Sequence, residues 1–172
     1  FLPAGEKDRS LEDVLKINTS SRRVRWPPGT RMAYANPGYL VAGRLIERVT
    51  EQPYEDYIQR EIFDPLQMTS SSFRLTSADE PLLARGYNAP SGPPVGFPRI
   101  YLRPAGNMHR SAHDMARFVQ MLLGWGELGT TFIVDPEYLG NMEQPRTTLA
   151  AAAGLRNGYG TGYTHNLYIG NV

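Results

Sequence analysis

One stretch decides the fold: Pro28-Gly29-Thr30-Arg31-Met32-Ala33-Tyr34-Ala35-Asn36-Pro37-Gly38-Tyr39. Its centre places the phenol of Tyr34 two positions before the carboxamide of Asn36. A phenol has an unperturbed pKa of about 10, so it serves as a general base at neutral pH only where positive charge surrounds it. A catalytic interpretation of these residues therefore predicts an acyl-transfer enzyme. A structural interpretation makes Asn36 a simple helix cap.

A helix is predicted to begin at this stretch. Asn36 is expected to cap it, and Pro37 suits the first helical position, where its missing N–H costs nothing. Apolar residues then recur at helical spacing and predict one buried face, while Arg44, Glu47 and Arg48 look outward. The residues of that apolar face are Leu40, Val41, Leu45, Ile46 and Val49.

Composition narrows the class of protein. A chain of 172 residues with 41% hydrophobic and 20% charged residues suits one soluble, globular domain. A net charge of +1 gives no reason to expect nucleic acid, and no apolar run is long enough to span a membrane. No signal-peptide pattern opens the chain. The absence of cysteine excludes disulfides and thiolate catalysis, without fixing a compartment.

Three further helices are predicted from caps and periodicity. Ser10, with Asp13 three residues on, marks the start of the first, and Ser111, with Asp114, marks the start of the last. A middle helix begins near Pro53 and ends at Asp64-Pro65. Gly124 suits the end of the last helix. The side chains expected to be buried are Leu11, Val14, Leu15 and Ile17 in the first, Tyr54, Tyr57, Ile58 and Ile62 in the second, and Met115, Phe118, Val119, Leu122 and Leu123 in the third.

Other segments carry weaker signals. Residues 86–106 hold five prolines and no helical periodicity, which predicts a long loop, either a lid or a surface connection. Residues 150–153 favour a helix or a tight turn. Residues 158–172 alternate in the manner of a strand or hairpin. Residues 19–28 form a loop in which Arg22, Arg23 and Arg25 are expected to be solvated or ion-paired.

Alternative chemistries find little support. His109 and His113 are four residues apart, a spacing that suits a metal on one helix face. Ser111 stands between them as a helix cap, however, and no carboxylate pattern accompanies them or His165. The chain has no Gly-x-Ser-x-Gly elbow. The glycine-rich residues 158–162 precede no helix, so a strand is preferred to a phosphate loop.

The longer context of Tyr34 resembles the serine beta-lactamase-related family, which includes class C beta-lactamases, DD-peptidases and esterases of the same fold. The resemblance rests on residues 28–39, on the helix that ends Ile46-Glu47-Arg48-Val49-Thr50, and on Ile62-Phe63-Asp64-Pro65-Leu66-Gln67-Met68. Pro104-Ala105-Gly106 with residues 111–118, and Leu2-Pro3 with the helix from Ser10, also resemble family segments. The likeness covers nearly the whole chain.

The resemblance implies a mixed α and β, beta-lactamase/transpeptidase-like fold. Residues 1–172 would form a single partial domain, mainly the helical subdomain with long loops and a little edge β-structure. In this family the serine of a Ser-x-x-Lys motif forms an acyl-enzyme. The family pattern makes Tyr34 the acid/base and Asn36 the group that holds the substrate amide and the motif lysine.

The chain departs from the family pattern in two motifs. It has only two lysines, Lys7 and Lys16, and no Ser-x-x-Lys, and it has neither Lys-Thr-Gly nor His-x-Gly. We interpret it as an internal piece of a longer serine hydrolase and expect the piece alone to be inactive. The alternative is a non-catalytic binding or scaffold module with the same fold.

The resemblance also sets expectations for partners and location. We expect no cofactor and no metal. The resemblance implies a small-molecule or peptide substrate for the parent protein: a beta-lactam, a D-Ala-D-Ala peptide or a small ester. An exported or periplasmic location is slightly favoured by the family.

Overall fold

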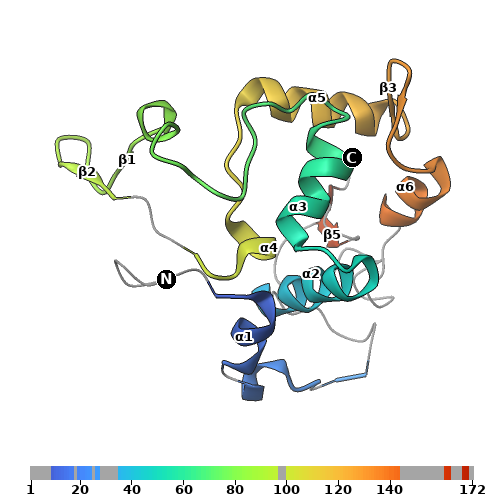
Figure 1. The fold of residues 1–172 in the computed structure, drawn as a ribbon, viewed down its shortest axis with the longest axis horizontal. Helices are drawn as coiled ribbons and strands as arrows, with labels where there is room; N and C mark the ends of the chain where they lie inside the picture. Colours follow the sequence, from blue (N-terminus) through green and yellow to red (C-terminus); the bar gives the residue numbers. More distant parts are fainter. Residues whose placement is uncertain are drawn as a thin grey trace.

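The computed structural model of this chain describes residues 9–17, 19–24, 26–27, 35–96, 100–143, 161–163 and 168–170. Most of its regular structure is helical, and the strands in these ranges form three two-stranded antiparallel hairpins (Figure 1). The helices are α1 (Leu11–Lys16), η1 (Thr19–Arg22), α2 (Asn36–Thr50), α3 (Tyr54–Ile58), η2 (Gln59–Phe63), η3 (Glu80–Leu82), α4 (Arg103–Gly106), α5 (Ala112–Leu123) and α6 (Pro136–Glu143). The strands are β1 (Gly86–Tyr87), β2 (Pro94–Val95), β3 (Glu127–Leu128), β4 (Thr131–Phe132), β5 (Thr161–Tyr163) and β6 (Tyr168–Gly170).

Helix α1 begins as the sequence predicts. The Ser10 hydroxyl oxygen accepts a hydrogen bond from the Asp13 N–H at 3.0 Å and donates one to the Asp13 carboxylate at 2.7 Å. Leu11 and Val14 are buried, as predicted. Ile17 is exposed, contrary to prediction, because the helix ends one residue before it.

The start of helix α2 differs from the prediction by one residue. Ala35 is the N-cap and Asn36 is the first helical residue, and no side chain among the described residues caps this end of the helix. Ala35 is extended (φ −148°, ψ 98°), and its carbonyl accepts a hydrogen bond from the Gly38 N–H at 3.0 Å. The backbone of Ala35 therefore does what an N-cap backbone does. The prediction that Asn36 caps the helix was wrong.

The predicted apolar face of α2 is only partly buried. Leu40 is buried in a small cluster with Leu11 and Val14, and Ile46 is half-buried. Val41, Leu45 and Val49 expose 49%, 62% and 75% of their surface. Helices α1 and α4 pack on the side of Leu40 and Gly43. Val41, Leu45 and Val49 lie on the opposite side and are left exposed.

The main core lies between α3, η2 and α5. Five buried side chains and the residues packed on them form what we call the main core. The five buried side chains are Phe63, Leu66, Met68, Phe73 and Met121. The Phe63 ring stacks on Phe73 with 5.9 Å between centroids, and Tyr54 meets Phe73 edge-on at 5.3 Å. Helix α3 follows Pro53 and continues as the π-helical η2 to Phe63, which confirms the predicted middle helix and its end at Asp64.

Helix α5 confirms the predicted caps but not the whole predicted face. The Ser111 hydroxyl oxygen accepts a hydrogen bond from the Asp114 N–H at 3.1 Å, and Gly124 is the C-cap. Met121 is buried, whereas Val119 and Leu123 are exposed. The main core contacts only one side of α5, so the prediction that all five apolar residues of this helix are buried was too broad.

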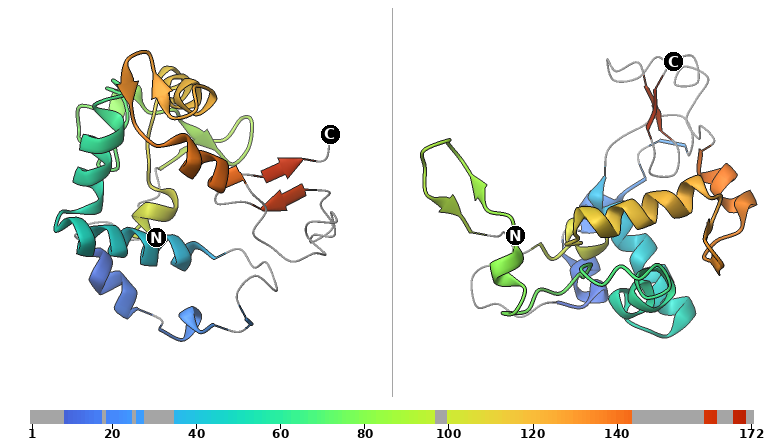
Figure 2. Two further views of the ribbon diagram at one scale, coloured as in Figure 1. Left: turned by 90° about the vertical axis from the view of Figure 1, so that its right-hand side faces the viewer. Right: turned by 90° about the horizontal axis from the view of Figure 1, so that it is seen from above.

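Residues 86–106 contain regular structure that the sequence did not predict. Strands β1 and β2 pair Gly86 with Val95 and Tyr87 with Pro94, and this hairpin extends away from the helices (Figures 1 and 2). Helix α4 is a single turn with Pro104 near its start. A four-residue helix is too short to show helical periodicity, which is why the sequence predicted a loop in its place.

The C-terminal half holds two elements that were missed and one that was predicted. Hairpin β3–β4 and helix α6 were not predicted from the sequence. The strands of the hairpin are two residues long, too short to show the alternation of a strand. Strands β5 and β6 pair antiparallel, which confirms the hairpin predicted within residues 158–172. Residues 150–153 and His165 lie outside the described residues.

Candidate active site

Asn36 is the one predicted catalytic residue that the structure describes; Tyr34 lies outside the described ranges. The Asn36 side chain is half-buried at the first position of α2. Its Oδ1 atom is fully buried and has no hydrogen-bond partner among the described residues. Buried polar atoms are nearly always paired, so an orphan of this kind needs a reason. The carboxamide is not used by the helix that carries it.

Helix α2 is held from one side by close packing. A Cβ atom added to Gly43 would lie 2.6 Å from Cγ of Pro104 on α4. Only glycine allows this approach between the two helices. Leu40, one turn earlier, packs with Leu11 and Val14, and half-buried Tyr101 and Leu102 complete that cluster. The second turn of α2, from Leu40 to Gly43, is therefore fixed by close packing against α1 and α4.

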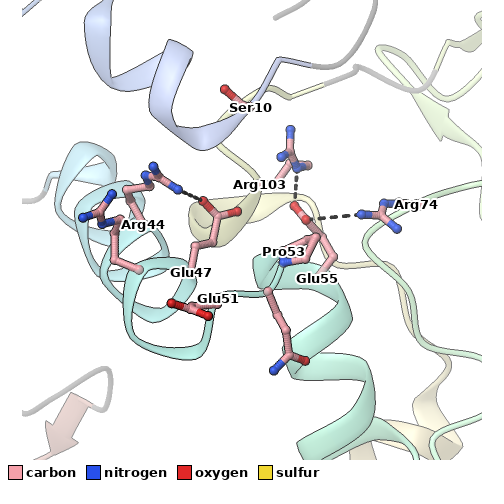
Figure 3. Close-up of a pocket in the computed structure, with 10 residues that line it drawn as sticks. Ser10, Arg44, Glu47, Glu51, Pro53, Glu55, Arg74 and Arg103 are labelled. Carbon is pink, nitrogen blue, oxygen red and sulfur yellow. Dashed lines mark hydrogen bonds and ion pairs between the residues drawn. The ribbon is translucent and has the colours of Figure 1, made fainter.

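A buried ion pair joins α3 to α4. The Glu55 carboxylate is buried and accepts a hydrogen bond from Nε of buried Arg103, while Arg74 Nη2 lies 3.6 Å from its other oxygen (Figure 3). Arg103 Nη1 also donates to the Arg9 carbonyl at 2.8 Å. Each buried charge therefore has a charged or polar partner, as burial requires.

Glu47 continues this network on α2. Its carboxylate accepts a hydrogen bond from Arg44 Nη1 at 3.0 Å (Figure 3). It also accepts one from the Tyr54 N–H at 3.2 Å. The second contact caps the start of α3, which Pro53 does not cap with a side chain. Arg44 also pairs with Glu12 of α1. Glu47 thus fixes the angle between α2 and α3.

An open hollow of about 600 Å³ lies over these ion pairs, between α2, α3 and α4. Glu47 is eleven residues beyond Asn36 on one helix, a separation of about 16 Å at 1.5 Å per residue. The hollow therefore does not adjoin Asn36. Arg44, Arg74 and Arg103 each pair with a carboxylate, so we interpret the hollow as a structural junction. The lining residues are Ser10, Arg44, Glu47, Arg48, Glu51, Gln52, Pro53, Glu55, Arg74 and Arg103.

A second polar centre surrounds Asp114 at the start of α5. The buried carboxylate of Asp114 accepts hydrogen bonds from the Ser70 N–H and the Ser71 hydroxyl, both at 2.8 Å. Burial raises the pKa of Asp114, but the hydrogen bonds from Ser71 and Ser70 outweigh it and hold the pKa below its ordinary value. Asp114 therefore ties the turn after Met68 to α5.

The predicted histidine pair is separated by the helix start, as the sequence indicates. His109 precedes α5 and forms an isolated bridge with Ser72, while His113 lies on α5 with its ring exposed. Burial lowers the pKa of His109, and Asp79 opposes the shift. In the described ranges, no three His, Cys, Asp or Glu side chains gather in a way that would hold a metal ion.

Sequence reasoning missed the roles of Glu55, Arg103 and Glu47. Glu55 and Arg103 are 48 positions apart and have no local signature. Asp114 was predicted only as part of the helix cap, although its carboxylate also accepts hydrogen bonds from Ser70 and Ser71 of a distant segment. For the arginines of residues 19–28, Arg25 and the Arg22 side chain lie outside the description.

Comparison with known proteins identifies the family. The sequence model of the family described as Beta-lactamase matches residues 3–171. The chain belongs to the beta-lactamase family. The resemblance to serine beta-lactamases and DD-peptidases is thereby confirmed. No helix among the described residues is long and apolar enough to cross a membrane.

Members of the beta-lactamase family match the chain in sequence and structure. Protein flp of Staphylococcus aureus (strain COL) is 31% identical over 120 residues, which are 68% of this chain and 24% of that protein. A solved octameric penicillin-binding protein homologue from Pyrococcus abyssi is 26% identical and covers 98% of this chain and 36% of its own, with a TM-score of 0.69. A beta-lactamase/D-alanine carboxypeptidase from Pseudomonas syringae is 27% identical and covers 82% of this chain and 38% of its own, with a TM-score of 0.59.

These matches confirm the predicted beta-lactamase/transpeptidase-like fold, with a mostly helical piece and little β-structure. They also show that the chain spans about a quarter of the length of protein flp (24%) and about a third of the two solved chains (36% and 38%). The chain is homologous to serine hydrolases.

Proposed function

We propose that this chain supplies one wall of the active site of a serine hydrolase, which cleaves an ester or amide bond through an acyl-serine intermediate. Its substrate is a beta-lactam, a D-Ala-D-Ala peptide or a small ester. Tyr34 acts as the acid/base, and Asn36 positions the substrate. The observation that carries the proposal is the buried Oδ1 of Asn36, which has no partner in the described ranges.

The energetics of Asn36 support a role outside the fold. A buried amide oxygen without a partner costs about 1–3 kcal/mol. An N-cap role would have removed this cost, but Ala35 is the N-cap. A carboxamide has one acceptor oxygen and two donor hydrogens. Asn36 is therefore suited to accept from a substrate amide N–H or a lysine ammonium that the completed site provides.

The helix start also suits acyl transfer. The first turn of α2 has no acidic residue, so the positive end of its dipole is not neutralised by its own sequence. A positive field lowers the pKa of a nearby phenol and stabilises the oxyanion of an acyl-transfer transition state. Both effects favour Tyr34 and Asn36 at this end of the helix.

The bond changes of this reaction balance with one water. The serine oxygen attacks the substrate carbonyl carbon, and its proton passes by way of Tyr34 to the departing amine or alcohol. Water then attacks the carbonyl carbon of the acyl-serine ester, the bond from that carbon to the serine oxygen breaks, and a proton from the water restores the serine hydroxyl as the acid is released. The chain contains no Ser-x-x-Lys motif, so we expect residues 1–172 alone to be inactive and the nucleophile to lie elsewhere in the complete protein.

A labelling experiment tests the proposal. The full-length product of the gene that encodes this chain and the chain 1–172 are each treated with a fluorescent penicillin and with a fluorophosphonate. We expect labelling of one serine in the full-length protein and none in 1–172. If neither probe labelled the full-length protein, the result would contradict the proposal that it is a serine hydrolase. If it still bound cell-wall peptide, it would be the non-catalytic binding module.

Tyr34→Phe tests the role of the phenol. In the full-length protein it should lower turnover by about 100-fold or more, because proton transfer is lost. The acyl-enzyme would then form slowly enough to follow by the fluorescence of the attached label. An unchanged rate would make Tyr34 a structural residue.

A further inference from the structure

A cavity of about 380 Å³ lies between three segments that are distant in the sequence. Its walls come from the turn after Met68, from residues 75–83 with the short helix η3, and from residues 109–111 just before α5. This volume is within the range of small-molecule binding sites, about 300–1,000 Å³. The described residues that line it include neither Asn36 nor any residue of the hollow over the ion pairs. The cavity therefore needs an explanation of its own.

The walls of this cavity are held by hydrogen bonds within the chain. Ser72 and His109 exchange backbone hydrogen bonds of 2.9 and 2.8 Å, which join the first wall to the third. In the second wall, the Asp79 carboxylate accepts hydrogen bonds from the Thr76 N–H at 2.8 Å and the Thr76 hydroxyl at 2.7 Å. The Leu82 N–H donates to the Asp79 carbonyl at 2.9 Å. The cavity is therefore formed before any ligand arrives, as small-molecule sites usually are.

Three leucines give the cavity an apolar side. Leu75, Leu82 and Leu83 all line it. Leu82 exposes 83% of its surface and Leu75 exposes 37%, while Leu83 is half-buried. An apolar group that enters the cavity removes part of this leucine surface from water, which is favourable. The leucine side of the cavity therefore suits an aliphatic side chain or an aromatic ring.

The cavity also carries one negative and one positive side chain that are not paired with each other. Both hydrogen bonds from Thr76 go to Oδ2 of Asp79, and no described residue donates one to Oδ1. The same hydrogen bonds hold the pKa of Asp79 below its ordinary value, so the carboxylate is charged at neutral pH. Arg110 is exposed and has no carboxylate partner among the described residues. A ligand can therefore engage both charges.

We propose that this cavity binds a free amino acid with an apolar side chain. The ligand carboxylate pairs with Arg110, its ammonium group donates to Oδ1 of Asp79, and its side chain packs on Leu75, Leu82 and Leu83. A zwitterion engages both charges at once, whereas a simple carboxylic acid or a simple amine leaves one of them without a partner. The inference uses no serine chemistry and does not depend on the proposed function.

Titration calorimetry of the full-length protein with leucine tests the proposal, with both enantiomers of the amino acid. We expect one equivalent of leucine to bind. Leucine amide lacks the carboxylate, N-acetylleucine lacks the ammonium group, and glycine lacks the apolar side chain. Each of these should bind at least about 10-fold more weakly, because each loses one of the three contacts. Equal affinity for leucine and all three analogues would overturn the proposal.

Two substitutions locate the site. Arg110→Gln and Asp79→Asn should each weaken the binding of leucine by about 10-fold or more. Arg85→Gln is the matched control, because Arg85 is exposed and does not line the cavity. Asp79→Asn keeps an acceptor oxygen for the hydrogen bonds from Thr76. If that variant failed to fold, Arg110→Gln would decide, since the Arg110 side chain pairs with no described residue.

The outcomes separate this site from catalysis. No binding at millimolar leucine, or equal binding by wild type and Arg110→Gln, would overturn the proposal. Binding that is lost once a fluorophosphonate has acylated the protein, but kept in Arg110→Gln, would assign leucine to the catalytic site and also overturn it. Binding that requires Arg110 in a protein that no serine probe labels would support the cavity and remove the proposed function. A labelled protein that binds no leucine would do the reverse.

Discussion

The main core and helix α2 bury apolar side chains to different extents. Phe63, Phe73 and Met121 come from three separate segments and are enclosed by residues of this chain. Helix α2 is longer than either α3 or α5, yet only Leu40 and Gly43 are buried on it. The main core is complete within the described ranges, and α2 is covered on one side.

This difference separates stability from function. The main core holds its loops with a buried carboxylate, Asp114, whose hydrogen bonds to Ser70 and Ser71 are all internal. Helix α2 instead leaves an unsatisfied oxygen on Asn36 and an open apolar face one turn further on. The region that leaves groups unpaired is the one that carries the predicted catalytic residue.

The largest expected effect contrasts one residue from each region. Phe63→Ala removes a fully buried ring stacked on Phe73 and should lower the free energy of unfolding of 1–172 by about 3–5 kcal/mol. Leu45→Ala, at an exposed position of α2, should change it by no more than about 0.5 kcal/mol. Urea titration followed by circular dichroism measures both. Comparable losses would erase the distinction between the two regions.

Glu55→Gln tests the junction that connects them. It leaves the buried guanidinium of Arg103 without its counter-charge and should cost about 3 kcal/mol of unfolding free energy. Arg74→Gln is the control, because the Arg74 side chain is more than half exposed and its ion pairs are worth about 1 kcal/mol or less. If the two variants lost equal stability, the buried pair would have no special weight.

Asp114→Asn should cost about 2 kcal/mol at neutral pH, because the hydrogen bonds from Ser70 and Ser71 then go to a neutral acceptor instead of a charged one. The pKa of Asp114 is lowered in the folded state, so its stabilisation is present above the unfolded value of about 3.9 and disappears as the pH falls through the folded pKa. The unfolding free energies of wild type and Asp114→Asn should therefore converge on acidification below about pH 4. A constant gap down to pH 2 would contradict this assignment.

Asn36→Ala should have the smallest effect on stability. Its side chain caps nothing and its Oδ1 has no described partner, so the unfolding free energy of 1–172 should stay within about 0.5 kcal/mol of wild type or rise. The same substitution at full length should remove most turnover. Measured together, these two numbers show whether Asn36 belongs to the fold or to the reaction. A loss of 1 kcal/mol or more, typical of a lost cap, would return it to the fold.

The sequence predicted the elements whose signals are local. Ser10 and Ser111 act as caps through the residue three positions on, and both were found. The start of α2 was placed one residue late because Ala35 caps with its backbone, which no side chain announces. The role of Tyr34 stays a prediction.

Contacts between distant segments were beyond a sequence argument. The Glu55–Arg103 pair depends on α4, whose single turn was hidden in a predicted loop. The exposure of Leu45 and Val49 reflects what covers α2, which periodicity cannot tell: a helical stripe shows that a face is apolar, and says nothing of which segment meets it.

The contact between Gly43 and Pro104 restricts which sequences this fold accepts. Gly43 has no side chain and Pro104 has a closed ring, so no rotamer change can make room for an added atom. Position 43 should be among the least tolerant in a saturation mutagenesis library, although it touches neither charge nor substrate. Its defects should be suppressed by changes at position 104 that remove ring atoms, such as Pro104→Ala. Substitutions at positions 43 and 104 would then be tolerated only in certain combinations, so that the two positions vary together.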